Sequence, residues 1–133
     1  MAITGTEGPR ADVELRLPAD SAYVSVLRST AAGVASRLDF PLDGIEDLRV
    51  AVGEACALVL PEADEGTSLT GEFFLTGHGL TVTVAVTGSD LGPPDYESFA
   101  WQVLETLTAA ATATVADGRL SVTLTLGPEH PPA

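Results

Sequence analysis

Apolar and polar residues alternate along several stretches of the chain. Residues 12–17 place Val13, Leu15 and Leu17 on one face. Residues 69–76 and 80–87 alternate on either side of a glycine-containing turn, and residues 111–116 and 119–126 flank Asp117-Gly118. Because strand side chains point alternately to opposite faces, the pattern predicts one strand followed later by two β-hairpins. Each of these strands has one apolar and one polar or threonine-rich face.

Three other stretches have apolar residues at helical spacing. The first covers residues 20–37, and the second begins at Asp43, which can cap it while Glu46 reaches back as in a capping box. The third follows Asp95, a candidate cap. The apolar stripes expected in chain order are Tyr23, Val26, Leu27, Val34 and Leu38, then Ile45, Leu48, Val52, Ala55 and Val59, then Tyr96, Phe99, Val103 and Leu107. Trp101 falls outside the third stripe.

The order of these elements is strand, helix, helix, hairpin, helix, hairpin. Strands with a single apolar face need one covering layer, so the helices should pack on one face of a mainly antiparallel sheet. We predict an α+β fold, a two-layer α/β sandwich, over residues 12–126. Residues 1–11 and 127–133 show no periodicity, so we expect a flexible N-terminal arm and a flexible tail. The length of 133 residues fits one domain.

The charge of the chain narrows the classes of partner. Nineteen acidic residues stand against six basic ones, which are all arginine, and the net charge is −13. Such a chain would repel nucleic acid and anionic membranes, so neither is expected as a partner. No apolar run has the length of a transmembrane helix or the layout of a signal peptide, so we expect a cytoplasmic protein. A basic protein remains a suitable partner.

Cysteine and histidine offer little chemistry. Cys56 is the single cysteine, and the two histidines are His78 and His130, which excludes an internal disulfide and leaves no recognisable metal cluster. We therefore predict no metal site. Cys56 is interpreted as a small buried thiol in a helix. His78 stands at the tip of the first hairpin, where a turn residue is expected rather than a catalytic one.

One long segment resembles a known family. Residues 15–56, LRLPADSAYVSVLRSTAAGVASRLDFPLDGIEDLRVAVGEAC, resemble the bacterial anti-sigma factors and serine-protein kinases related to the histidine-kinase and heat-shock-chaperone ATPases. The similarity spans about residues 12–126 and is most specific in EDLRVAVGEAC. Residues 98–126 look closer still to the actinobacterial branch, which includes the mycobacterial stress-sigma-factor antagonist. The resemblance implies a histidine-kinase-like ATPase fold and a role in transcription regulation under stress.

The resemblance also implies where an ATP site would lie. The family has a Glu and an Asn one turn apart on its second helix, where the Glu is a general base and the Asn a ligand of Mg²⁺. Glu54 matches that Glu, but Leu58 stands at the Asn position and cannot coordinate a metal. Asp90 and Gly92 can be aligned with the Asp-x-Gly motif that contacts adenine. The family's glycine-rich phosphate turn is not evident at residues 98–101, so ATP and Mg²⁺ are expected only if the pocket is still functional.

Each of these residues has an alternative interpretation. Glu54 is either a vestigial general base or a solvated residue at the edge of a groove, and an Asp-x-Gly sequence such as the one at Asp90 is common in loops. Arg28 matches an arginine in the family's sigma-contact region but is also an ordinary surface residue. Trp101 is either an interface anchor or the filling of a collapsed nucleotide pocket.

Three functions follow as hypotheses. The leading one is an anti-sigma factor-like regulator with a degenerate nucleotide site, which binds a sigma factor, is released by an antagonist and is not an enzyme. The second is an ATP-dependent serine-protein kinase that acts on such an antagonist. The third is an interaction domain with another partner on the same fold. Relatives that dimerise make a homodimer an expected assembly.

Overall fold

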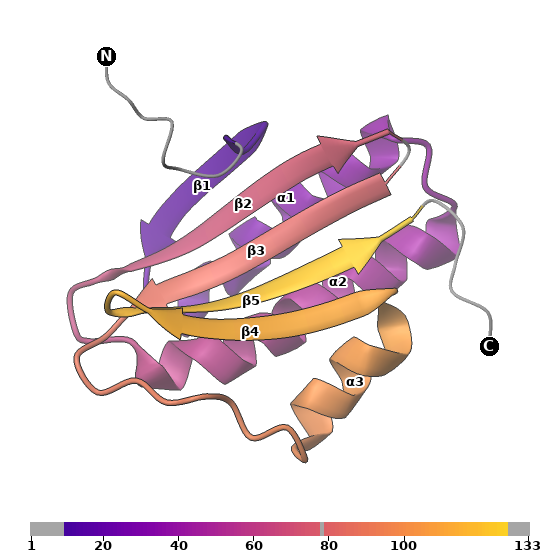
Figure 1. The fold of residues 1–133 in the computed structure, drawn as a ribbon. Helices are drawn as coiled ribbons and strands as arrows, with labels where there is room; N and C mark the ends of the chain where they lie inside the picture. Colours follow the sequence, from indigo (N-terminus) through magenta and orange to yellow (C-terminus); the bar gives the residue numbers. More distant parts are fainter. Residues whose placement is uncertain (1–9, 78, 128–133) are drawn as a thin grey trace.

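The computed structural model describes residues 10–77 and 79–127. The described chain forms five strands, three α-helices and two short 3₁₀-helices (Figure 1). In chain order these are β1 (Val13–Pro18), η2 (Ser21–Tyr23), α1 (Val24–Arg37), α2 (Leu42–Val59), η3 (Leu60–Glu62), β2 (Ser68–Thr76), β3 (Gly79–Thr87), α3 (Phe99–Leu107), β4 (Ala110–Ala116) and β5 (Arg119–Leu126). No helix of this part of the chain is long and apolar enough to cross a membrane.

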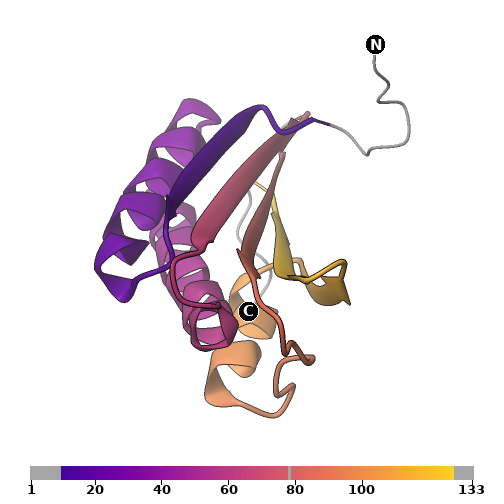
Figure 2. The same cartoon turned by 90° about the vertical axis from the view of Figure 1, so that its left-hand side faces the viewer.

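The strands form one antiparallel sheet in the order β1-β2-β3-β5-β4. Figure 2 shows α1 and α2 side by side on one side of this sheet. The predicted α+β sandwich is therefore confirmed. Both predicted hairpins form, and the second turns through Asp117 and Gly118, whose φ angles of 56° and 74° suit a tight primed turn. His78 lies outside the described residues.

The core fills the space between the helices and the inner face of the sheet. The alternation of the strands places the expected residues there, and all of the following are buried: Leu69, Phe73, Leu80, Val82, Val84, Val86, Leu120, Val122, Leu124 and Leu126. The opposite face is rich in threonine, and Thr83 and Thr123 share a hydrogen bond of 3.0 Å across β3 and β5. One covering layer is therefore sufficient for this sheet.

The predicted buried stripe of the first helix is wrong in part. Leu27, Ala31 and Ala35 are its buried residues, whereas Tyr23 and Val26 are exposed. Leu27 fills the space over Gly71, where a Cβ atom would overlap its Cδ1 atom. The fit between these two residues therefore helps to determine the face that this helix buries.

The predicted caps of the other two helices are also wrong. α2 has Pro41 as its N-cap residue and begins at Leu42, so Asp43 lies within the first turn and no capping box forms. The cap of α3 is Ser98, whose Oγ accepts a hydrogen bond of 3.2 Å from the Trp101 amide. Asp95 instead accepts a bond of 2.9 Å from the amide of Glu97 in the turn before the helix.

The side chains that α3 buries differ from those expected. Trp101 is 3% exposed and Leu104 is fully buried, whereas Tyr96 and Phe99 are exposed. The expectation that Trp101 lies off the buried face is therefore wrong. Tyr96 sits in the preceding turn, where its ring meets that of Trp101 edge to face at a centroid distance of 4.9 Å.

Candidate functional site

The two residues that the family resemblance singled out on the second helix lie one turn apart in α2. Residues four apart on a helix share a face. Glu54 is half-buried, and Leu58 is half-buried with its side chain packed against the hydrophobic core. A carboxylate at this place could accept a proton, but the position one turn further on supplies packing and no oxygen for a metal ion.

Arg28 reaches from α1 onto α2 beside Glu54. Its Cδ atom lies 3.5 Å from the position that a Cβ atom of Gly53 would occupy, which is an ordinary van der Waals distance, so the arginine stem lies over Gly53. The Nε atom of Arg28 is buried and has no hydrogen-bond partner within the described residues. Arg28 is thus a half-buried part of the α1–α2 interface and not a freely exposed surface charge.

Gly53 belongs to this arrangement, although it was not predicted from the sequence. Glycine is a poor helix former, and its presence in the interior of an 18-residue helix was the available signal. The side chain of Arg28 lies against Gly53, at a distance that would also accommodate a methyl group there.

Cys56 also lies on α2 and is fully buried, as predicted. Burial raises the pKa of its thiol to about 12, because the thiolate would lose its hydration, and the positive charge of Arg28 lowers that pKa in part. A thiol with such a pKa is protonated near neutral pH, and nucleophilic chemistry requires the thiolate. Cys56 is therefore a packing residue.

The loop between β3 and α3 holds the residues aligned with the adenine motif. At its start, a Cβ atom on the buried Gly88 would lie 2.5 Å from the carbonyl oxygen of Glu62, so the loop is pressed against η3. Asp90 is exposed, and a Cβ atom on Gly92 would meet open space. Leu91, between them, packs its side chain against the core. The loop thus directs an apolar side chain inward and its carboxylate outward.

Trp101 belongs to the same apolar cluster as Leu104 of α3, and Leu58 and Leu91 pack against that cluster. A side chain that is 3% exposed has almost no surface to offer to a partner in this conformation. The position therefore matches the second interpretation of Trp101, a side chain that fills the interior. A contact between its ring and a partner would require α3 to move.

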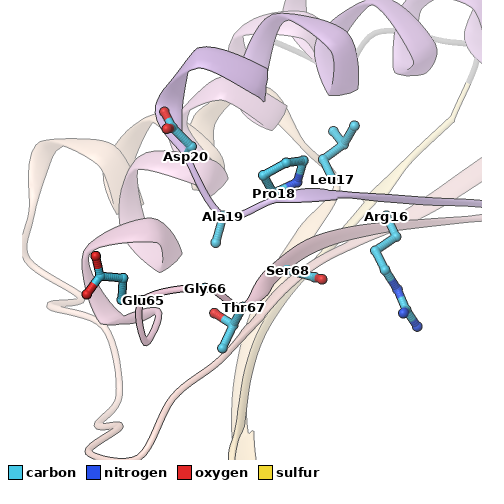
Figure 3. A pocket seen from close by; sticks show the side chains of 9 residues that line it. All are labelled: Arg16, Leu17, Pro18, Ala19, Asp20, Glu65, Gly66, Thr67 and Ser68. Atoms are coloured by element: carbon cyan, nitrogen blue, oxygen red, sulfur yellow. The ribbon is translucent and has the colours of Figure 1, made fainter.

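A pocket of about 560 Å³ lies elsewhere, at the end of β1 and the start of β2 (Figure 3). Its lining includes Arg16, Asp20 and Glu65, and neither Glu54 nor Asp90 takes part. In Figure 3 the side chains of Arg16, Asp20 and Glu65 point in different directions. Asp20 is also engaged as the cap of η2, where it accepts a bond of 2.9 Å from the amide of Ala22. The pocket does not bring its charged groups to one point.

Metal ligands do not gather in the described part of the chain. Within residues 10–77 and 79–127, no three side chains of His, Cys, Asp or Glu are placed to hold an ion together. The acidic residues of α2 and of the loop after β3 therefore do not form a self-sufficient metal site. A divalent ion at Glu54 would need ligands from a nucleotide or from water.

Several curated proteins are similar in sequence to this chain, among them three that carry the name serine-protein kinase RsbW. The protein of Bacillus cereus is 37% identical over 78 residues, which are 57% of this chain and 49% of the relative. That of Halalkalibacterium halodurans is 39% identical over 77 residues, or 57% and 48%. That of Bacillus mycoides is 32% identical over 94 residues, or 62% and 59%. No protein-family profile matches the chain.

These matches confirm the predicted relationship to the family of serine-protein kinases and anti-sigma factors. The chain spans about half the length of the first two relatives, so the similarity does not extend to their whole length. The closer likeness to the actinobacterial branch stays a prediction. The same holds for the roles assigned to Glu54, Asp90, Gly92, Arg28 and Trp101, which neither the fold nor the matches test.

Proposed function

Because this chain is a relative of the anti-sigma factor and serine-protein kinase family, we propose that it is an anti-sigma factor-like regulator with a degenerate nucleotide site. It binds and sequesters a sigma factor in the bacterial cytoplasm, and an antagonist protein releases it. Residues 12–126 act as the regulatory domain. The observation that carries the proposal is the side chain of Leu58, which packs against the core at the place of the expected magnesium ligand.

The loop after β3 supports the loss of nucleotide chemistry. A nucleotide site needs donors for phosphate and a polar contact for adenine. Leu91 is directed into the core from this loop, Asp90 is exposed, and the chain contains no lysine. Glu54 is the surviving part of the family's catalytic pair. It could accept the proton of an attacking hydroxyl, but without a metal ligand beside it the phosphate that this hydroxyl would attack is not activated.

The charge of the molecule supports a protein partner. With a net charge of −13 the chain complements a basic surface, which a sigma factor must have where it contacts DNA. Complementary charge accelerates the encounter and rejects acidic partners. We propose that Arg28, at the α1–α2 interface, contacts the sigma factor on the helical side of the molecule.

Binding to purified sigma factors of the source organism tests the proposal. Titration calorimetry should find one sigma factor bound with a dissociation constant near or below about 1 μM. Arg28→Met keeps most of the apolar stem over Gly53 but removes the charge, and it should weaken that binding. Arg10→Ala, at an exposed position outside the helices, is the matched charge control. If none of the sigma factors binds the intact chain, the proposal is wrong.

The kinase function is the second candidate, because the relatives bear the name serine-protein kinase. A kinase must bind ATP with Mg²⁺, which calorimetry measures directly. We expect no detectable heat of binding for the unmodified chain. If only the metal ligand were missing, Leu58→Asn would restore affinity for ATP, with Leu58→Met as a control for altered packing. ATP binding by the unmodified chain, together with transfer of phosphate to an antagonist, would favour the enzyme instead.

An interaction domain for some other partner is the third candidate. A gene for a sigma factor or an antagonist next to that of this chain would favour the regulator over this alternative. Light scattering of the purified chain would establish whether it forms the proposed homodimer. Neither observation depends on whether the nucleotide site is functional.

A further inference from the structure

Helix α3 is apolar on two sides, but the fold uses only one of them. Trp101 and Leu104 face the core, where α3 packs against α2. On another side Phe99, Val103 and Leu107 follow one another at intervals of four residues, the spacing of a continuous stripe. Phe99 is 77% exposed, whereas the other two are half-buried.

The stripe borders a shallow groove. Phe99, Val103 and Leu107 line a depression of about 230 Å³ together with Gln102 and Thr106. In Figures 1 and 2, α3 lies at the border of the molecule, with no other element beyond it. We call these five residues the α3 groove. Large exposed aromatic residues beside a groove are the usual anchors of protein interfaces.

The segment that contains α3 carries one sign of charge. Between Gly88 and Gly118 the chain has five carboxylates and no arginine or lysine. Asp95 and Glu97 precede the helix, and Glu105 lies on it, and all three are exposed. An apolar stripe on a helix with exposed carboxylates on it and before it complements an amphipathic helix that carries lysine or arginine beside its apolar face.

We propose that the α3 groove is the docking surface for a basic amphipathic helix of the sigma factor. This inference rests on the proposed function and adds a second contact surface, on α3, to the contact proposed for Arg28. Phe99 inserts between apolar side chains of the partner helix, and Glu97 and Glu105 pair with basic residues at its borders. The core residues of α3 take no part, because Trp101 and Leu104 already pack inside the molecule.

The test compares Phe99→Ala with Leu42→Ala. Leu42 is a matched control because it is 73% exposed, close to the 77% of Phe99, and lies on a different helix. Phe99→Ala should weaken the calorimetric affinity for the sigma factor by at least about tenfold, whereas Leu42→Ala should leave it within about twofold. Both variants should keep the unfolding free energy of the parent, since neither side chain belongs to the core.

Two double substitutions that remove charges complete the experiment. Glu97→Gln with Glu105→Gln should slow association and reduce its salt dependence. Glu46→Gln with Glu65→Gln, at exposed positions outside the 88–118 segment, should have a smaller effect.

If the parent binds the sigma factor and Phe99→Ala binds equally well, the inference is overturned and the proposed function stands. If the parent binds no sigma factor, the proposed function fails and the inference with it. If Phe99→Ala changes only the self-association seen by light scattering, the groove binds a second copy and the assignment is also wrong.

Discussion

The contact of Arg28 with α2 determines the environment of three neighbouring residues. The stem of Arg28 lies over Gly53, its Nε atom is buried, and its charge acts on the thiol of Cys56. A buried polar atom without a hydrogen bond costs free energy, so the local packing must hold it in place. The side chain of Arg28 is thus held against α2 at Gly53, next in sequence to Glu54, the position aligned with the family's glutamate.

The raised pKa of Cys56 predicts a loss of stability at alkaline pH. Its thiol has a pKa of about 12 in the folded protein, raised by burial from an ordinary value of 9.0. Above pH 9 the unfolded chain releases the proton while the folded chain keeps it, so the free energy of unfolding falls as the pH rises towards 12. Between about pH 8 and pH 10 the loss should be roughly 1 kcal/mol, measured by urea unfolding.

Cys56→Ala is the control for this effect. The variant removes the titrating group, so the cysteine's share of the decrease should disappear, although its stability at neutral pH will be somewhat lower because the core loses contacts. An equal decrease in the parent and the variant would show that other groups cause it.

At the scale of elements, the loop from β3 to α3 is held to the rest of the fold at its first residue, Gly88. Gly88 donates its amide to the carbonyl oxygen of Gly118 at 3.0 Å, and its Cα faces the carbonyl oxygen of Glu62. The loop is therefore held between the second hairpin and η3. Leu91, three residues further along this loop, packs its side chain against the core.

Substitution of Gly88 tests that link. Gly88→Ala places a methyl group 2.5 Å from a backbone oxygen, which cannot rotate away, so the loop or η3 must shift. We expect a loss of about 1–3 kcal/mol in the free energy of unfolding. Gly92→Ala, in the same loop but facing open space, should change it by less than about 0.5 kcal/mol. Equal effects of the two substitutions would contradict the proposed contact.

The alternation of apolar and polar residues and the residue types in the turns were sufficient to predict the strands of the sheet and its hairpins. The alternation of β2, β3 and β5 indicated which side chains they bury, and Asp117-Gly118 indicated the second turn. The helices were harder because their buried faces depend on distances between elements. Leu27 of α1 packs over Gly71 of β2, two residues far apart in the sequence, and no local pattern contains that information.

The candidate site was predictable to the same limited degree. Leu58 was identified by its type at a family position, which needs no knowledge of the fold. There were two errors in α3: the cap was placed three residues too early, at Asp95, and the apolar side with Phe99 was chosen over the side with Trp101, which the fold buries. A serine and an aspartate cap helices about equally well, so local preference could not decide between them.

For the whole molecule, acidity is the dominant electrostatic property. Nineteen carboxylates and six guanidinium groups leave an excess that ion pairs cannot neutralise. The pair of Arg119 with Glu72, at 3.1 Å, is partly exposed and contributes little to stability. Mutual repulsion of the remaining carboxylates therefore opposes the compact state.

Salt should stabilise the fold. Sodium chloride screens the repulsion, so the Tm measured by calorimetry should rise as the salt concentration increases from about 0.02 M to 0.5 M. A gain of about 1 kcal/mol corresponds to roughly 3–6 °C for a domain of this size. The increase should be smaller near pH 5, because the isoelectric point is about 4.1 and fewer charges remain. A Tm that falls with salt would show that attractive pairs outweigh the repulsion.

The strand order has a consequence for how this molecule meets other chains. β1 and β4 are the two edges of the sheet. β1 carries Glu14 and Arg16 and ends at Pro18, three features that discourage a further strand, whereas β4 reads AATATVA and has neither charge nor proline. The unguarded amides and carbonyls of β4 are thus the place where an extended peptide from another chain would lengthen the sheet, which makes this edge the weak point of the fold against aggregation.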